Sequence, residues 1–308
     1  MFKLPTAAVH IIAASVLALA AAGGARAQTM SYADIERLPA PPPGIRSAYG
    51  EGPQQFGELR LPKGRGPFPV AFIIHGGCWY SQYDLRHVAP FAAALTEAGY
   101  ATWTVEYRRV GDEGGGWPGT FQDAARAADH LRALARTYPL DLKRVVAVGH
   151  SAGGELALWL AARRRMPAGG PLHSAAPLRL RGVVSLAGVT DLRQFRPRCG
   201  DAPAKLLGGP PDGLDERYRL TSPVELLPLR VPQRLIHGAQ DSIVPVELGR
   251  KYEEAARGKG EDVRLTVVEG AGHFELIAPH SSAWPAVTAA LRELSNPGSH
   301  TRRPRHGL

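Results

Sequence analysis

The sequence predicts one α/β domain, in which a mostly parallel sheet is covered by helices on both faces. Short apolar runs alternate with helical patterns along the chain, which is typical of strands joined by crossover helices. Residues 70–74 and 145–148 are continuously apolar, and residues 183–187 are apolar apart from Ser185, as expected of strands buried on both faces. The 308 residues also suit a single domain of this class once a leader is removed.

The individual elements follow from the local patterns. The predicted strands are a segment around Tyr49 and residues 56–61, 70–74, 100–107, 145–148, 183–187, 232–237 and 263–268. The predicted helices are residues 87–98, 120–137, 246–256 and 283–294, with a further helix that starts after residue 151 and ends at the arginines 163–165. Residues 188–230 are rich in Pro and Gly, and we expect short helices there that shape a substrate pocket.

The first 27 residues have the pattern of a secretory signal peptide. Lys3 precedes an apolar stretch, residues 11–22, that is too short to span a bilayer comfortably. Ala25-Arg26-Ala27 forms a cleavage site, so we expect cleavage after Ala27 and a periplasmic or secreted protein. The alternative is an uncleaved membrane anchor. No other stretch is long and apolar enough to cross a membrane, so no stable membrane span is expected after cleavage.

The rest of the chain divides into three parts. Residues 28–43, which end in three prolines, predict an extended N-terminal arm. Residues 44–295 are predicted to form the α/β domain, and residues 296–308 are predicted to form a disordered basic tail. The formal charge of +9 is interpreted as arginine-rich solvated faces, because no nucleic-acid-binding motif accompanies it. Oligomeric state does not follow from the sequence.

The chain has two cysteines, Cys78 and Cys199. In an oxidising compartment they are allowed to form a disulfide, but sequence does not give the distance between them. Because Cys78 lies within a loop of functional interest, we expect it to be a buried free thiol. The chain has no C-x-x-C motif and no metal-ligand spacing, so no metal and no cofactor are expected.

A G-x-S-x-G motif follows the apolar run 145–148 directly. Gly149, Ser151 and Gly153 form it, and a helical pattern comes next. Strand, tight turn and helix in this order present a serine hydroxyl at the end of a sheet, where the flanking glycines allow a sharp turn. The N-terminus of the helix favours negative charge that forms nearby. Ser151 is therefore the candidate nucleophile.

A serine nucleophile needs a base, and the base needs an orienting carboxylate. Asp241 and His273 follow the predicted strands 232–237 and 263–268, in the order Ser151, Asp241, His273. Asp241 is the candidate acid, with Asp191 as its best competitor. His273 is the candidate base, with His280 as a weaker one.

Acyl transfer also requires N–H donors for an oxyanion. We expect one from Ala152, which follows the nucleophile. The others are assigned to Gly77 and Cys78, in the loop after the strand 70–74, with Gly76 as the alternative. The His75 side chain is expected to brace this loop.

Four motifs together carry a family resemblance: HGGCW, GHSAGG, GAQDSIVP and GAGHFE. Over residues 56–294 the chain resembles the α/β-hydrolase superfamily. Its HGG-x-W motif is similar to that of the esterase/lipase and kynurenine formamidase-like branch, which includes feruloyl and acetylxylan esterase-like members. The resemblance implies a metal-free serine hydrolase that acylates Ser151. The chain departs from the lipase pattern HGGG, because Cys78 occupies the fourth place.

We therefore expect an exported carboxylic ester hydrolase that acts on a small-molecule ester or amide. The first alternative is an arylformamidase-like amidase of the N-formylkynurenine type, which the signal peptide disfavours because that pathway is usually cytoplasmic. A peptidase is less expected, since no propeller-sized domain precedes the hydrolase region. A non-catalytic protein of this fold would be expected to lack a triad member, whereas Ser151, Asp241 and His273 are all present.

Overall fold

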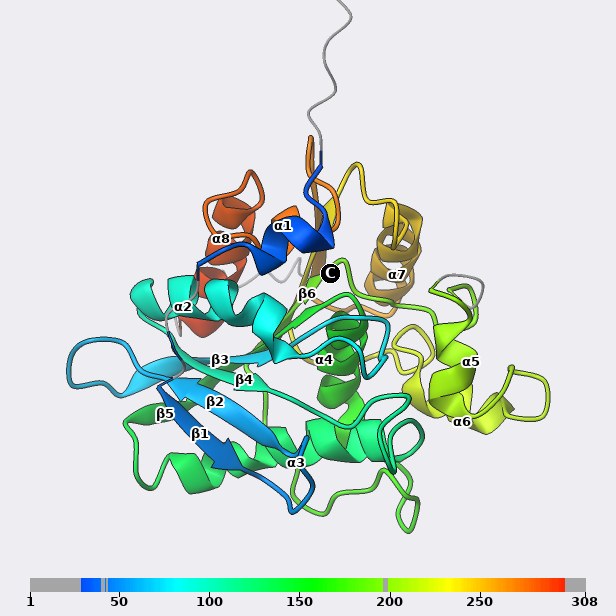
Figure 1. Cartoon of the computed structure of the whole chain (residues 1–308). Coiled ribbons are helices and arrows are strands. Elements are labelled where there is room, and N and C mark those ends of the chain that lie inside the picture. Colours follow the sequence, from blue (N-terminus) through cyan, green and yellow to red (C-terminus); the bar gives the residue numbers. More distant parts are fainter. Residues whose placement is uncertain (1–28, 40–41, 43, 196–198, 297–308) are drawn as a thin grey trace, which may run out of the picture.

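The computed structural model describes residues 29–39, 42, 44–195 and 199–296 (Figure 1). One eight-stranded sheet runs through them in the order β1-β2-β4-β3-β5-β6-β7-β8. Its strands are β1 (Ile45–Ala48), β2 (Phe56–Arg60), β3 (Phe68–Ile74), β4 (Ala101–Val105), β5 (Leu140–His150), β6 (Gly182–Leu186), β7 (Gln233–Gly238) and β8 (Val263–Val268). Pairing is antiparallel between β1 and β2 and between β2 and β4, and parallel elsewhere. The predicted fold class is confirmed.

Helices lie on both faces of this sheet. In Figure 1, α2 and α8 lie above β3 and β4, and α3 lies below the sheet. The helices are α1 (Tyr32–Glu36), α2 (Ala89–Glu97), α3 (Gly119–Leu134), α4 (Ala152–Ala162), α5 (Ala202–Leu207), α6 (Asp215–Thr221), α7 (Val246–Gly258) and α8 (Trp284–Ser295), with 3₁₀ turns η1 (Leu85–Val88), η2 (Arg163–Arg165) and η3 (Glu275–Ile277). Because α4 is apolar on nearly every side, it is buried along its length.

Burial explains why the middle of the sheet was predictable. Every residue of β6 is buried, as is the run 145–150 of β5. Strands covered on both faces need no polar alternation, so their sequences read as continuous apolar runs. The apolar face of α3 is also buried, since Ala124, Ala128 and Leu131 are at most 2% exposed. The core therefore lies on both sides of β3, β5 and β6.

The N-terminal arm differs from its prediction. Residues 28–43 were expected to be extended, but α1 forms within them. The Ser31 hydroxyl accepts from the Asp34 N–H, and the Asp34 carboxylate accepts from the Ser31 N–H at 2.8 Å. This capping box satisfies N–H groups that a free helix end would leave unpaired. Buried Ile35 then anchors the turn against the domain.

Two predicted segments lie outside the described residues: the signal peptide, residues 1–27, and the basic tail apart from Asn296. Among the residues that the structure does describe, no helix has the length and apolarity needed to cross a membrane. Short helices do form in residues 188–230, as expected: α5 and α6 lie side by side at the right of Figure 1.

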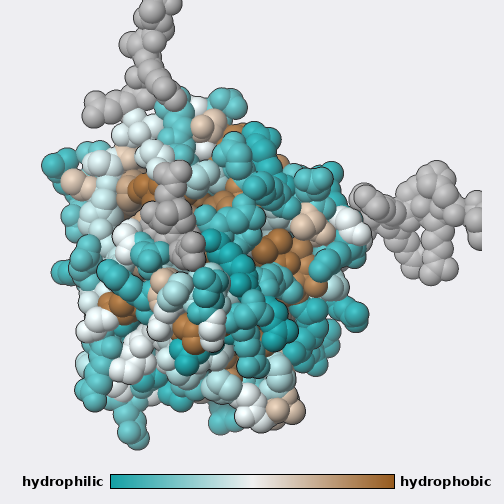
Figure 2. Space-filling view, turned by 90° about the vertical axis from the view of Figure 1, so that its right-hand side faces the viewer, coloured by the Kyte–Doolittle hydropathy of each residue, from teal (hydrophilic) through white to brown (hydrophobic). Residues whose placement is uncertain are grey.

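Figure 2 shows the side of the molecule that carries α5 and α6. Where grey atoms do not cover this face, hydrophobic residues form small, separate patches among hydrophilic ones. Patches of this kind are ordinary on a protein surface and do not indicate a broad apolar interface.

Candidate active site

Ser151 lies at a sharp turn between β5 and α4. Its φ is 55° and its ψ is −118°, a conformation that side-chain-bearing residues rarely adopt. A Cβ at Gly149 would lie 1.9 Å from the Gly153 oxygen, and one at Gly153 would lie 2.2 Å from the Ile74 oxygen. Only glycine fits at either position, so the motif is a steric requirement of the turn. Ser151 is 3% exposed at the carboxyl end of the sheet.

Asp241 and His273 are brought together directly. The His273 Nδ1–H donates to Asp241 Oδ2 at 2.7 Å, and Asp241 Oδ1 accepts from the N–H groups of Ile243 and Val244 at 2.8 and 2.9 Å. Burial opposes ionisation of Asp241, but these hydrogen bonds and the neighbouring imidazole outweigh it and hold the pKa of the carboxyl below its ordinary value. Since an ionised carboxylate only accepts, the imidazole proton lies on Nδ1 and leaves Nε2 as a base.

Asp191 and His280, the competing acid and base, make contacts of a different kind. Asp191 Oδ1 accepts from the N–H groups of Arg193 and Gln194, and its second oxygen accepts from the Gln194 side chain at 2.7 Å. These contacts stabilise a turn after β6. The His280 ring lies against Trp284, with centroids 6.1 Å apart. Of the two candidate acids, Asp241 is the one hydrogen-bonded to His273.

His150 links the nucleophile to the base. Its Nε2–H donates to the His273 carbonyl oxygen at 3.1 Å, and the two rings lie 4.5 Å apart. Burial and nearby His273 lower the pKa of His150 well below its usual value, so this ring is neutral. Within the described residues the His273 ring is hydrogen-bonded to Asp241, and no hydrogen bond joins it to Ser151.

The loop after β3 approaches the nucleophile closely. A Cβ at Gly76 would lie 3.0 Å from the Ser151 Cβ, which leaves room for nothing larger than glycine. Gly77 and Cys78 both have positive φ, 105° and 51°, so the chain folds back on itself here. In the described part of the chain the N–H groups of Gly77, Cys78 and Ala152 donate to no other residue. They remain able to bind an oxyanion.

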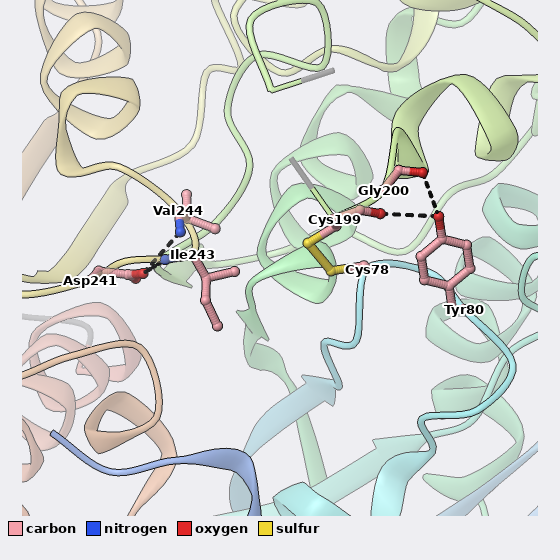
Figure 3. Close-up of a disulfide and its surroundings, with 7 residues drawn as sticks. All are labelled: Cys78, Tyr80, Cys199, Gly200, Asp241, Ile243 and Val244. Atoms are coloured by element: carbon pink, nitrogen blue, oxygen red, sulfur yellow. Dashed lines mark hydrogen bonds between the residues drawn. A yellow bond between two sulfur atoms is a disulfide. The ribbon is translucent and has the colours of Figure 1, made fainter. Parts of the chain in front are cut away.

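The expectation of a free thiol at Cys78 is wrong. Cys78 and Cys199 form a disulfide, with Cα atoms 6.1 Å apart (Figure 3). The Tyr80 hydroxyl lies beside it, within hydrogen-bonding distance of the carbonyl oxygens of Cys199 and Gly200, at 3.0 and 3.1 Å. The segment before α5 is thus fastened to the loop that carries the candidate oxyanion donors. The fold thus brings together two cysteines that are 121 residues apart in the sequence.

His75 braces this loop, as expected, and Glu106 is its partner. His75 Nε2 lies 2.8 Å from Glu106 Oε1, and its Nδ1 lies 2.7 Å from the Gly76 oxygen. Glu106 also accepts from the Leu85 N–H and pairs with Arg109 at 3.1 Å. Burial opposes ionisation of Glu106, but His75 and Arg109 hold its pKa below the ordinary value. No motif in the sequence marks Glu106, which directly follows β4.

Trp79 packs beneath the loop and reaches Glu155. The indole N–H donates to Glu155 Oε2 at 3.3 Å, and both residues are 0% exposed. Burial raises the pKa of Glu155 well above its ordinary value, which favours the protonated carboxyl. Its second oxygen has no partner among the described residues. Glu155 stands four residues after the nucleophile, yet nothing in the sequence marks it as buried.

The N-terminal arm lies against the loop of the candidate base. The Met30 N–H donates to Glu275 Oε1 at 2.5 Å, and Glu275 Oε2 accepts from the Gly272 N–H at 2.9 Å. The Tyr32 ring contacts the rings of Tyr83 and Phe274 edge-on. The arm therefore forms a wall near His273, a role that its sequence did not predict.

No group of three or more His, Cys, Asp or Glu side chains gathers as a metal site in the described ranges. The arrangement consists instead of a polarised imidazole, a serine at a helix N-terminus and free main-chain N–H groups. This combination suits nucleophilic acyl transfer.

The fold and this arrangement define an α/β-hydrolase. A family model, BD-FAE, matches residues 58–255, and the chain belongs to that family. The match begins in β2 and ends in α7, so it includes the serine turn and the Asp241 loop, and it stops before His273.

Two curated proteins of Mycobacterium tuberculosis (strain ATCC 25618 / H37Rv) are similar to it. A probable carboxylic ester hydrolase, LipM, is 27% identical over 62% of this chain and 46% of its own length. Esterase LipC is 26% identical over 75% of this chain and 60% of its own length. The chain thus spans about half the length of the curated relatives it matches. The solved structure of a truncated carbohydrate esterase from gut microbiota has a TM-score of 0.71 and 20% identity, over 82% of this chain and 97% of that one, which shows a shared fold.

Proposed function

We propose that this protein is a serine hydrolase that cleaves carboxylic esters of small molecules through an acyl-enzyme. The observation that carries the proposal is the 2.7 Å hydrogen bond between His273 Nδ1 and buried Asp241, beside the serine turn. The names of the two mycobacterial relatives support ester hydrolysis over other acyl transfers. Neither relative supports the arylformamidase alternative.

The geometry supports the following steps. The Ser151 hydroxyl attacks the ester carbonyl while its proton passes to His273 Nε2. Asp241, held ionised by its own hydrogen bonds, stabilises the imidazolium that forms. The carbonyl oxygen becomes an oxyanion that accepts from the N–H groups of Cys78 and Ala152, with Gly77 at the same loop. His273 then protonates the departing alcohol, and water repeats the sequence to release the acid.

We also propose that the chain is exported. The Cys78–Cys199 disulfide supports this, because disulfides persist in oxidising compartments. The test is fractionation of a bacterial host that expresses the full chain, with N-terminal sequencing of the product. We expect a periplasmic or secreted protein that begins at Gln28, and an Ala27→Trp variant that stays uncleaved. Full-length protein in the cytoplasm would overturn the proposal.

The catalytic proposal is tested with a serine-reactive fluorophosphonate and intact mass measurement. We expect one adduct on the wild type and on Ser242→Ala, an exposed control serine, and none on Ser151→Ala. Turnover of p-nitrophenyl acetate through decanoate, measured beside N-formylkynurenine, separates the ester from the formamide. Full turnover by Ser151→Ala would refute the mechanism, and a preference for the formamide would refute the ester assignment.

A further inference from the structure

A cavity lies at the opposite end of the parallel strands from Ser151. Its volume is about 620 Å³. It is bounded by the first residues of β5, the end of α4 with η2, and the segments that lead into β6 and β7. Because a strand rises about 3.3 Å per residue, Lys143 at this end of β5 is about 26 Å from Ser151. The cavity is therefore separate from the candidate active site.

The lining of this cavity consists of apolar and basic residues alone. Leu160, Leu178 and Leu229 line the cavity, and each is only 4 to 7% exposed to solvent. Six cationic side chains join them: Lys143, Arg164, Arg165, Arg179, Arg181 and Arg230. No acidic residue lines the cavity. We call this set the basic pocket.

Two acidic residues contact the segments that form the pocket, and both carboxylates accept hydrogen bonds there. Glu261 accepts from the main-chain N–H groups of Leu229 and Arg230, at 2.8 and 2.9 Å. Asp141 accepts from the Lys143 N–H and the Arg144 guanidinium, at 2.9 and 2.7 Å. The charge of Glu261 also acts on Arg165, so the positive charge of the pocket is partly offset.

The cations also act on one another. Burial, and the charge of Arg230 beside it, lower the pKa of Arg165. The helix dipole accounts for cations at the end of α4, where η2 begins. It does not account for Arg179 or Arg230, which lie in the segments before β6 and β7. Cations from four separate segments converge on one apolar hollow, an arrangement that an anionic ligand would stabilise.

We propose that the basic pocket binds a single-chain anionic amphiphile, with its aliphatic chain on the leucine floor and its head group among the guanidinium groups. Arginine binds phosphate and carboxylate groups through paired N–H donors, which suits this rim. The volume lies in the range of small-ligand pockets. A nucleic acid does not match an apolar floor, because it presents phosphate along a polar backbone.

The test is a calorimetric titration of Ser151→Ala with dodecyl phosphate, below its micelle concentration. That variant is first saturated with a short-chain ester, so that the candidate active site does not contribute binding. We expect one equivalent to bind. Arg179→Ala/Arg230→Ala should bind at least about tenfold more weakly, because two head-group contacts are lost. The matched control, Arg136→Ala/Arg250→Ala, removes two exposed arginines elsewhere and should bind as the parent does.

Each other outcome overturns the proposal. Inorganic phosphate that binds as tightly as dodecyl phosphate would show that charge alone is recognised. Dodecyl maltoside that binds as tightly would show that the apolar floor alone acts. Equal loss in both double variants would show a diffuse charge effect. If the first double variant does not fold, exposed Arg164→Glu serves in its place and should weaken binding likewise. The measurement does not use turnover, so it is independent of the proposed esterase activity.

Discussion

Removal of the Cys78–Cys199 disulfide by Cys199→Ser should lower both stability and turnover. The bridge closes a loop of 121 residues. In the chain-entropy description, a cross-link over that separation stabilises the folded state by about 4.9 kcal/mol at 25 °C. This is a large share of the 5–15 kcal/mol that is typical of a whole domain. The variant should still fold, because the Tyr80 hydroxyl and the 2.7 Å hydrogen bond from the Trp117 N–H to the Leu206 oxygen hold the same segment.

The effect on turnover follows from the position of Cys78. Loss of one oxyanion donor costs about 10² to 10³ in kcat. In Cys199→Ser the Cys78 N–H is retained but is less firmly placed, so we expect kcat to fall about tenfold with KM little changed. Urea unfolding followed by circular dichroism measures the first effect, and hydrolysis of a short p-nitrophenyl ester measures the second.

Two controls separate the disulfide from its surroundings. Tyr80→Phe removes the hydroxyl that bonds to Cys199 and Gly200 but keeps the bridge, so it should lose about 1 kcal/mol. Cys78→Ser/Cys199→Ser removes any reactivity of a lone thiol and should match Cys199→Ser. A loss of stability below about 1 kcal/mol together with unchanged kcat would refute the view that the bridge holds this loop.

Three further predictions concern the candidate site. Asp241→Asn should lower kcat about 10⁴-fold, because the imidazole loses its tautomer, whereas Asp191→Asn should leave steady-state kinetics unchanged; the reverse result would exchange the two roles. Gly76→Ala brings a methyl group within 2.9 Å of a main-chain oxygen and should abolish ester turnover, while Gly258→Ala meets nothing within 4 Å and should be neutral. Glu155→Gln should retain activity. Because the pKa of Glu155 is raised in the folded state, the stability of the wild type should fall as pH rises above about 4.5, by about 1.4 kcal/mol per pH unit up to the folded pKa. Thermal unfolding at several pH values should therefore show the stability of Glu155→Gln rising relative to that of the wild type as pH increases. A stability difference that stays constant with pH would refute a raised pKa of Glu155.

The central strands and the serine turn were predictable because their causes are local. A strand covered on both faces has a continuous apolar sequence, and the turn at Ser151 excludes any side chain at Gly149 and Gly153. The loops that carry Asp241 and His273 follow from the rule that parallel strands end at one edge of the sheet. These inferences need only a few neighbouring residues.

The partners of those motifs were not predictable, because each lies far away in the chain. Cys199 is 121 residues from Cys78, and residues 188–230 give no sign of where they fold. Glu106 follows β4 and Glu155 lies in α4, and no sequence motif marks either residue as buried. Glu106 contacts His75 and Glu155 contacts Trp79, and both acidic residues are buried in the folded chain. A charged residue type by itself predicts exposure.

The motifs were predictable and their distant partners were not, and this difference has a physical reason. Ser151, Cys78 and Trp79 all have positive φ, between 51° and 57°, which costs about 1–2 kcal/mol for a residue with a side chain. A short motif encodes where such a turn is needed but does not supply the contacts that keep it in place. The disulfide holds Cys78 and the Glu155 carboxyl holds Trp79, while Glu106 fixes the adjacent His75. The reactive geometry is therefore stabilised by residues that take no part in the reaction.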